Sequence, residues 1–202
     1  MKQQAGAGRD RWLDRWLPLI AERNAAPDGV RQDILELGCG EGIDSATLAM
    51  AGHIVYGIDL SAQAVEKATA RVPAARFRCQ DIRAPFPLLQ CRVVIASLSL
   101  HYFTWPETLE IAARIRETLA PEGILLCRLN SVNDVHYGAT GHAEIEKNYY
   151  RVDGAPKRFF DEADVNRMFS SGWRCLHLQE TISHRYDHPK NAWEAVLERT
   201  RH

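Results

Sequence analysis

The sequence lacks the features that define several classes of protein. No apolar run approaches the roughly 20 residues that a membrane-spanning helix needs, and the N-terminus lacks the apolar core of a secretory signal peptide. The five cysteines are odd in number and include no C-x-x-C pair, so neither a disulfide framework nor a zinc site is expected. We therefore expect a cytoplasmic protein that needs no membrane and no metal.

The chain also lacks an excess of charge of either sign. It carries 25 Lys and Arg against 26 Asp and Glu, which gives a net charge of −1. No overall basic field would attract a phosphate backbone, so a nucleic-acid partner is not favoured. A chain of 202 residues has the length of one domain and can bury roughly 70% of the surface that it exposes when unfolded. We expect a single domain over residues 1–202, as a monomer or a homodimer.

Short apolar runs alternate with helical segments over much of the chain. Thr104 and Glu107 form a T-x-x-E capping box, which is typical of the start of a helix. Such alternation predicts βαβ units around a parallel sheet, and strands that are apolar throughout predict helices on both faces of it. The expected strands are residues 34–37, 54–58, 76–79, 93–96, 124–127 and 173–181; the expected helices are 11–23, 44–51, 61–71, 104–119 and 161–169, with a last segment at 193–199.

Two segments depart from this alternation. Residues 1–30 combine a polar end with the amphipathic helix at 11–23, which Pro18 would kink or divide, and we expect them to form an N-terminal helical cap. Residues 130–158 form a long irregular connection after the fifth strand, rich in aromatic residues, Gly and His. Long connections of this kind are usually functional. We expect a lid over the carboxyl edge of the sheet, with a surface loop or a dimer contact as the alternative.

The first strand ends in a glycine-rich turn. Residues 36–42 read E-x-G-x-G-x-G between a strand and a helix. Glycines in this position let the backbone turn sharply and approach a ligand, and the following helix N-terminus favours an anionic group. Dinucleotide-binding domains instead use G-x-G-x-x-G, whose third glycine is replaced here by Ile43. The turn therefore argues against an NAD(P)-dependent oxidoreductase, which remains the alternative.

This turn resembles the first motif of the class I methyltransferases that depend on S-adenosylmethionine (SAM). Two further markers of that family match, an acid ending the second strand at Asp59 and an acid after the third at Asp81. The resemblance covers residues 30–130, and Val94–Tyr102 and the insert look like small-molecule enzymes of methyltransferase-domain types 11 and 12, including the tellurite-resistance-like group. It implies a Rossmann-like, doubly wound α/β fold with a mostly parallel seven-stranded sheet and an antiparallel C-terminal strand.

The resemblance also implies a cofactor, SAM, with S-adenosylhomocysteine as its product. Asp59 would accept hydrogen bonds from both ribose hydroxyls, and Asp81 would accept from the adenine amine between the apolar faces of Leu60 and Ile82. Glu36 would position the turn or the ammonium of the ligand, or merely cap backbone groups; Asp59 and Asp81 have turn or cap roles as their alternatives. The residues expected to bind the cofactor are Glu36, Gly38, Cys39, Gly40, Gly42, Asp59, Leu60, Asp81, Ile82 and Ser97.

The methyl acceptor is expected to be a small molecule attacked in line with the sulfonium, with water excluded. His101 follows the fourth strand and is the candidate catalytic residue, with a structural hydrogen-bonding role as the alternative. By resemblance, Trp12 of the N-terminal helix faces the site, with core packing as its alternative. A non-catalytic SAM-binding or partner-binding protein is the remaining alternative. The candidate substrate-binding residues of the insert are His136, Tyr137, Tyr149 and Arg158.

Overall fold

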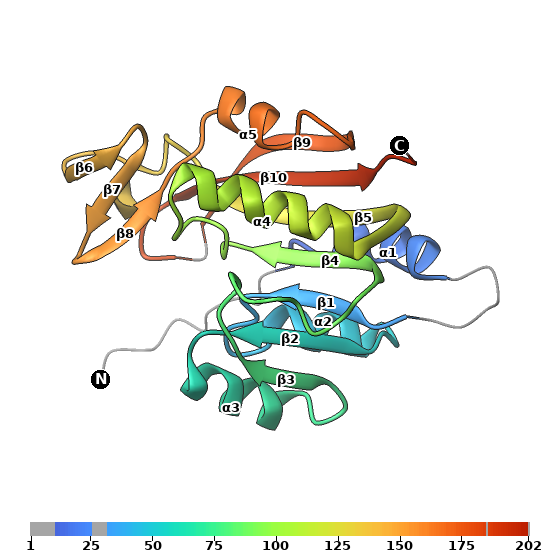
Figure 1. The fold of residues 1–202 in the computed structure, drawn as a ribbon. Coiled ribbons are helices and arrows are strands. Elements are labelled where there is room, and N and C mark those ends of the chain that lie inside the picture. The colour runs from blue at the N-terminus through green and yellow to red at the C-terminus, as the bar shows by residue number, and fades with distance from the viewer. Residues whose placement is uncertain (1–10, 26–31, 185, 202) are drawn as a thin grey trace, which may run out of the picture.

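The computed structural model describes residues 11–25, 32–184 and 186–201. A seven-stranded sheet runs through the molecule (Figure 1). β10 (Lys190–Arg199) is antiparallel to both of its neighbours, while the five strands on one side of it are mutually parallel. The predicted fold class is therefore confirmed. The order of the strands is β3 (Arg76–Cys79), β2 (Val55–Asp59), β1 (Ile34–Leu37), β4 (Cys91–Ser97), β5 (Leu119–Asn130), β10 (Lys190–Arg199) and β9 (Trp173–Ser183).

Helices cover both faces of this sheet because its inner strands carry buried apolar side chains on both sides. Successive side chains of a strand point to opposite faces, so Leu35 and Leu37 pack into one core and Ile34 into the other. In the described part of the chain, no helix is long and apolar enough to cross a membrane. The first core is covered by α4 (Trp105–Thr118) and α5 (Glu162–Met168), and the second by α1 (Leu17–Asn24) and α2 (Ile43–Met50), with α3 (Ala62–Arg71) against β2 and β3.

Local sequence signals explain where two of the helices begin. Pro18 divides the predicted N-terminal helix into a 3₁₀ turn, η1 (Asp14–Trp16), and α1, in whose first turn a proline costs no hydrogen bond. The capping box of α4 is confirmed, since Glu107 Oε2 accepts a hydrogen bond from the Thr104 N–H at 2.9 Å. The rest of the predicted N-terminal cap, residues 1–10 and 26–31, lies outside the described residues.

The insert after β5 is more regular than predicted. It contains a 3₁₀ turn, η2 (Val135–Tyr137), and a small antiparallel sheet of β6 (Ala143–Glu146), β7 (Tyr149–Val152) and β8 (Ala155–Arg158). The expectation of an irregular connection was wrong. The β7–β8 turn is Asp153-Gly154, both with positive φ, which is a typical hairpin sequence. Figure 1 shows this small sheet at the end of the molecule toward which β4 points, the carboxyl edge of the parallel strands.

Candidate functional site

Two adjoining cavities lie at the carboxyl edge of the parallel strands. The large cavity has a volume of about 760 Å³ and extends past the ends of β2 and β3. The small cavity has a volume of about 210 Å³ and lies against β1, β4 and β5. Both are lined by Gly38, Gly40 and Leu98, so the glycine turn after β1 separates them. A ligand that spans both cavities would cross this turn.

The glycine turn is shaped by close packing on one side and open space on the other. Gly38 has a φ of +71°, and a Cβ on it would lie 2.4 Å from the Cβ of Ser99, so a side chain would clash with the loop after β4. A Cβ on Gly40 would meet no atom within 4 Å. The backbone of Gly40 is therefore exposed to the cavities, as a cradle for a ligand requires.

Asp59 is held at the mouth of the large cavity by two backbone groups. Its Oδ2 accepts a hydrogen bond from the Gly40 N–H at 2.9 Å, and its Oδ1 accepts from the Ser61 N–H at 2.9 Å. Because an ionised carboxylate can accept about four hydrogen bonds, each oxygen keeps capacity for a ligand hydroxyl. The bond to Gly40 also ties the acid that ends β2 to the turn that follows β1, a link that the sequence did not reveal.

Asp81 also lines the large cavity, but an arginine two residues later engages it. The Arg83 guanidinium contacts both Asp81 oxygens at 2.7–3.1 Å, and the Arg83 N–H donates to Oδ1 at 2.8 Å. The hydrogen bond from the Arg83 side chain lowers the pKa of Asp81. Leu60 and Ile82 line the same cavity and offer apolar surface for a flat base. Binding of an adenine amine by Asp81 would therefore compete with Arg83.

Acidic side chains gather at the small cavity. Burial raises the pKa of Glu36 well above its usual value, and the charges of Asp44 and Asp59 raise it further, although a hydrogen bond from the Ser45 hydroxyl lowers it. Asp44, which was not singled out from the sequence, follows the turn at the start of α2 and accepts a hydrogen bond from Trp12 Nε1 at 3.0 Å. Burial also raises the pKa of the Cys39 thiol, so Cys39 is a neutral wall residue. This concentration of acids suits a cationic ligand.

His101 is buried beneath the loop after β4 and lines neither cavity. Its ring packs on Tyr102 with centroids 4.1 Å apart, and its Nδ1 has no hydrogen-bond partner among the described residues. Burial, with smaller effects of Lys157 and Lys190, lowers the pKa of His101 to about 3. The imidazole is therefore neutral at pH 7, and Tyr102, rather than His101, faces the large cavity.

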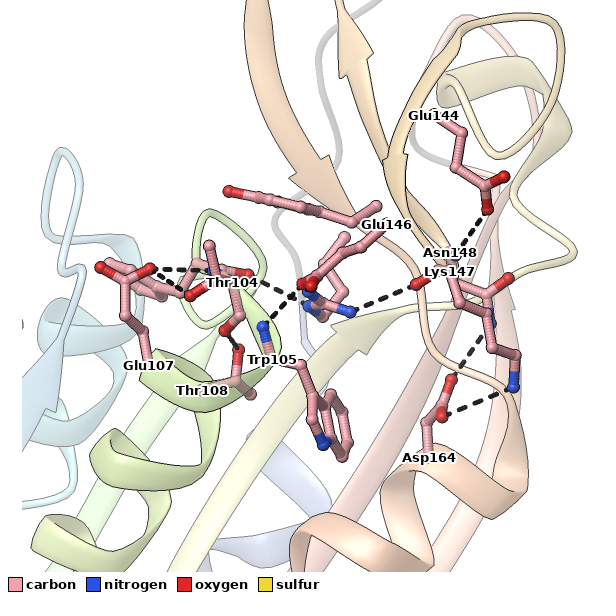
Figure 2. Close-up of polar contacts among 12 residues, drawn as sticks. Thr104, Trp105, Glu107, Thr108, Glu144, Glu146, Lys147, Asn148 and Asp164 are labelled. Atoms are coloured by element: carbon pink, nitrogen blue, oxygen red, sulfur yellow. Dashed lines mark hydrogen bonds and ion pairs between the residues drawn. The ribbon is translucent and has the colours of Figure 1, made fainter.

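Tyr149 and Arg158 attach the insert to the main sheet. Arg158 is ion-paired with Glu146, donates to the carbonyl oxygen of Phe103 at 3.1 Å, and lies 4.7 Å from the ring centroid of Tyr149. The Tyr149 hydroxyl donates to the carbonyl oxygen of Tyr102 at 2.9 Å. Figure 2 shows Glu146 beside the first turn of α4 at Trp105, whose N–H donates to it at 2.7 Å. Arg158 is thus buried in a structural network.

The other two substrate candidates lie elsewhere on the insert. His136 stacks on His188 with centroids 4.9 Å apart, and Tyr137 donates from its hydroxyl to the carbonyl oxygen of His188 at 3.1 Å. Neither of them lines the large or the small cavity. The insert reaches the large cavity through Pro156 instead. Among the residues that the structure describes, no cluster of three or more His, Cys, Asp and Glu could hold a metal.

Ser97 and Arg128 both line the small cavity. The sequence predicted Ser97 as a cofactor-binding residue, but it did not predict Arg128. The Ser97 hydroxyl accepts from Arg128 Nε at 2.9 Å. Tyr186, in the connection between β9 and β10, lines the same cavity. Neither Arg128 nor Tyr186 stands in a sequence motif, so only the packing of the fold identifies them.

Comparison with known sequences gives one consistent family. Residues 34–123 match the model of the methyltransferase domain family. The trans-aconitate 2-methyltransferase of Paracidovorax citrulli is 35% identical over 107 residues, which are 51% of this chain and 40% of that protein. A putative methyltransferase of Bacillus subtilis is 38% identical over 104 residues, 48% of this chain and 42% of that protein. The matches span about half the length of these curated relatives, or less.

Comparison with solved structures extends the likeness to nearly the whole fold. A SAM-dependent methyltransferase of Clostridium acetobutylicum has a TM-score of 0.74 at 16% identity, covering 95% of this chain and 92% of that one. The magnesium protoporphyrin IX methyltransferase of Synechocystis, solved with SAM bound, has a TM-score of 0.65 at 19% identity, covering 93% and 78%. At such identities these likenesses concern the fold.

Proposed function

We propose that this chain, which carries a class I SAM-dependent methyltransferase domain over residues 34–123, transfers the methyl group of SAM to a small-molecule acceptor. The family match confirms the resemblance seen in the sequence motifs. One observation carries the proposal: the Gly40 N–H donates to Asp59 Oδ2 at 2.9 Å where the two cavities meet. That bond joins the glycine turn and the carboxylate into one cradle.

In this proposal the two cavities divide the cofactor between them. The adenosyl part occupies the large cavity, with the ribose hydroxyls on Asp59, the base between Leu60 and Ile82, and its amine at Asp81. The sulfonium and the amino-acid part lie across Gly38 and Gly40 toward Glu36. The remaining residues assigned to cofactor binding at this turn and beside it are Cys39, Gly42 and Ser97.

SAM supplies a methyl group on a positively charged sulfur, which is already a strong electrophile. The chain therefore has to orient the acceptor in line with that sulfur and exclude water, and it needs a general base only where the acceptor carries a proton at attack. We assign His101 a structural role, because it is buried and its pKa is lowered to about 3. If a His101→Asn variant that folds normally loses turnover while keeping SAM affinity, this assignment is wrong.

The acceptor is proposed to be a small molecule held on the outer side of the large cavity. Tyr102, Phe103 and Pro156 line that side, and Pro156 belongs to the insert. One curated relative is named for trans-aconitate and one structural neighbour for magnesium protoporphyrin IX, both small molecules, which supports this class. Four residues of the insert that were candidates for substrate binding do not line the large cavity: Arg158, Tyr149, Tyr137 and His136. We propose that they position the insert, and with it Pro156, at this cavity.

Incubation of the protein with methyl-labelled SAM and a metabolite extract tests this function. Label should appear in a low-molecular-weight product with the wild type, and much less of it with Asp59→Ala when SAM is limiting. Product identification by mass spectrometry would then name the acceptor. Label that appears only in protein or nucleic acid, or in no product at all, would contradict the proposal of a small-molecule methyltransferase.

A further inference from the structure

Two buried hydrogen-bond donors without partners lie where β4 and β5 end. The Ser99 hydroxyl, in the loop after β4, and the amide nitrogen of Asn130, the last residue of β5, have no hydrogen-bond partner among the described residues. Lys190 Nζ donates to Asn130 Oδ1 at 3.0 Å, and because an ammonium cannot accept, the unpartnered atom of Asn130 is its N–H donor. Buried polar groups rarely lack partners, so these two donors indicate a place for a ligand with acceptor atoms.

Lys157 on β8 brings a positive charge without an ion pair to the same region. Its Nζ donates to the carbonyl oxygen of Tyr137 at 2.7 Å and forms no ion pair with any described residue. An ammonium has three donors, so two of them remain. Burial lowers the pKa of Lys157 and the charge of Lys190 lowers it further, whereas the charges of Asp134 and Asp153 raise it. Lys157 is therefore a partly buried cation that an anion would stabilise.

The buried carboxylate in this region, Asp134, is already engaged by other groups. Its Oδ2 accepts from Lys190 Nζ at 2.7 Å, and its Oδ1 accepts from the Asn191 N–H at 3.0 Å. Lys157 and Lys190 together thus exceed Asp134 by one positive charge. Both charges also act on His101 in the loop after β4, since they add to the effect of burial in lowering its pKa. The excess charge therefore lies close to that loop.

One surplus positive charge and several free donors match a carboxylate, which only accepts hydrogen bonds and carries a single charge, whereas a phosphate carries more. We propose that Lys157, the Asn130 amide and the Ser99 hydroxyl bind a carboxylate of the methyl acceptor, so that the acceptor is a carboxylic acid. Ser99 lines the large cavity, as does Pro156, which precedes Lys157 on β8. The carboxylate would thus lie at the border of the cavity assigned to the acceptor. The inference rests on the proposed function and names the class of its substrate.

Fractionation of a metabolite extract tests the charge of the acceptor. An anion-exchange resin divides the extract into a retained, anionic fraction and an unretained fraction, and each is incubated with methyl-labelled SAM and the wild type. Label should appear in products of the retained fraction, and prior treatment of that fraction with alkaline phosphatase should not reduce it. Label found mainly with the unretained fraction, or lost after phosphatase treatment, would overturn the inference.

Two variants test where the carboxylate binds. With the retained fraction as a limiting acceptor, Lys157→Met should slow methyl transfer about tenfold to a hundredfold, the range of a charge-assisted hydrogen bond. Asn130→Asp keeps an acceptor for Lys190 but replaces the free donor with a negative charge, so it should slow transfer at least as much. Calorimetry should give both variants the wild-type affinity for S-adenosylhomocysteine. The matched control is Lys147→Met, which removes a 71% exposed lysine of the same insert and should change neither quantity.

Three outcomes would count against the inference. Wild-type rates in Lys157→Met and Asn130→Asp would overturn it and leave the proposed function standing. An equal loss of rate and of affinity for S-adenosylhomocysteine would show that these residues only support the fold, which would also overturn it. If the wild type methylates neither fraction, the proposed function itself fails, and the inference fails with it.

Discussion

Asp59 joins parts of the chain that are far apart in sequence. Its carboxylate accepts a hydrogen bond from Gly40, 19 residues earlier, and another from Ser61 at the start of α3. The same side chain therefore fixes the glycine turn and lines the large cavity. A residue with both tasks can position a ligand without moving, which reduces the entropy lost on binding.

Replacing Asp59 tests the ribose assignment. Asp59→Ala should weaken SAM binding by about 2–4 kcal/mol, because two charge-assisted hydrogen bonds to the ribose and the support of the turn are lost together. Calorimetric titration measures this difference. Glu110→Ala, an exposed acid on α4, serves as the control and should bind like the wild type. Equal affinity of the Asp59 variant and the wild type would remove the assignment.

Glu36 should couple SAM binding to proton release. Burial, and then the charges of Asp44 and Asp59, raise the pKa of Glu36 in the free protein. A bound cation favours the ionised carboxylate and lowers this pKa, so binding releases a proton and affinity rises with pH until the raised pKa is passed.

Calorimetry in two buffers with different ionisation enthalpies measures the released proton directly. Glu36→Gln should abolish the dependence of the binding heat on the buffer. Affinity that does not change between pH 5 and pH 8, together with a binding heat that is the same in both buffers, would show that Glu36 does not face the cationic part of the ligand.

At the scale of elements, the insert is fastened to the start of α4. Glu146 of β6 accepts from the Trp105 N–H and pairs with Arg158 of β8, while Tyr149 of β7 donates to the backbone of the loop before α4. Each strand of the small sheet therefore contributes one anchor. Because Pro156 of the same sheet lines the large cavity, the anchors also set the shape of that cavity.

Arg158→Met should loosen the insert. We expect a loss of about 2–4 kcal/mol in the free energy of unfolding, somewhat below a fully buried pair because the Glu146 side chain is 36% exposed. Hydrogen exchange should accelerate over residues 143–158. Lys147→Met, which breaks pairs of a 71% exposed lysine, should change stability little. Unchanged exchange in the Arg158 variant would show that the insert is held by other contacts.

Local signals predicted the elements around the proposed cofactor site. The apolar runs that end at Leu37 and Ile58 predicted β1 and β2, and the glycines and the acid after them are the residues to which we assign cofactor binding. The small sheet of the insert was missed, although Asp153-Gly154 is a hairpin signal, because the polar composition of the insert was given more weight than its turn chemistry.

Residues whose roles depend on distant partners were not predictable from the sequence. Arg158 was expected to bind the substrate, but its side chain is buried against Glu146 and the loop before α4. Arg83 donates a hydrogen bond to Asp81, and no sequence motif predicted this contact. Arg128 reaches the small cavity because β5 lies beside β4, which is a property of the sheet order.

At the scale of the whole molecule, segments on either side of residues 34–123 complete the two cavities. Trp12 lies before residues 34–123, donates a hydrogen bond to Asp44 and packs against Arg128. Pro156 and Tyr186 lie after these residues, and they line the large and the small cavity, respectively. We therefore propose that residues 1–202 act as one domain. The family match alone would leave the small cavity without Arg128.

The fold holds His101 neutral, which makes its stability sensitive to acid. The pKa of His101 is about 3 in the folded protein because of burial, against 6.5 when exposed. The unfolded chain therefore takes up a proton below about pH 6.5 that the folded chain does not bind, and this residue lowers stability by about 1 kcal/mol per pH unit as the pH falls from there.

Urea unfolding at pH 7 and pH 5 measures this effect. The wild type should lose about 2 kcal/mol more than a His101→Gln variant between these two values. The control His142→Gln replaces an exposed histidine of the insert and should lose as much stability as the wild type. If His101→Gln is as acid-sensitive as the wild type, His101 is not held neutral by the fold.

The most direct test of the account is a set of calorimetric titrations of the wild type with SAM, S-adenosylhomocysteine and NAD. A cradle formed by a glycine turn, Asp59 and buried acids should bind SAM and S-adenosylhomocysteine at one site per chain and should not bind NAD. Binding of NAD without binding of either adenosyl sulfur compound would contradict the account and would favour an oxidoreductase.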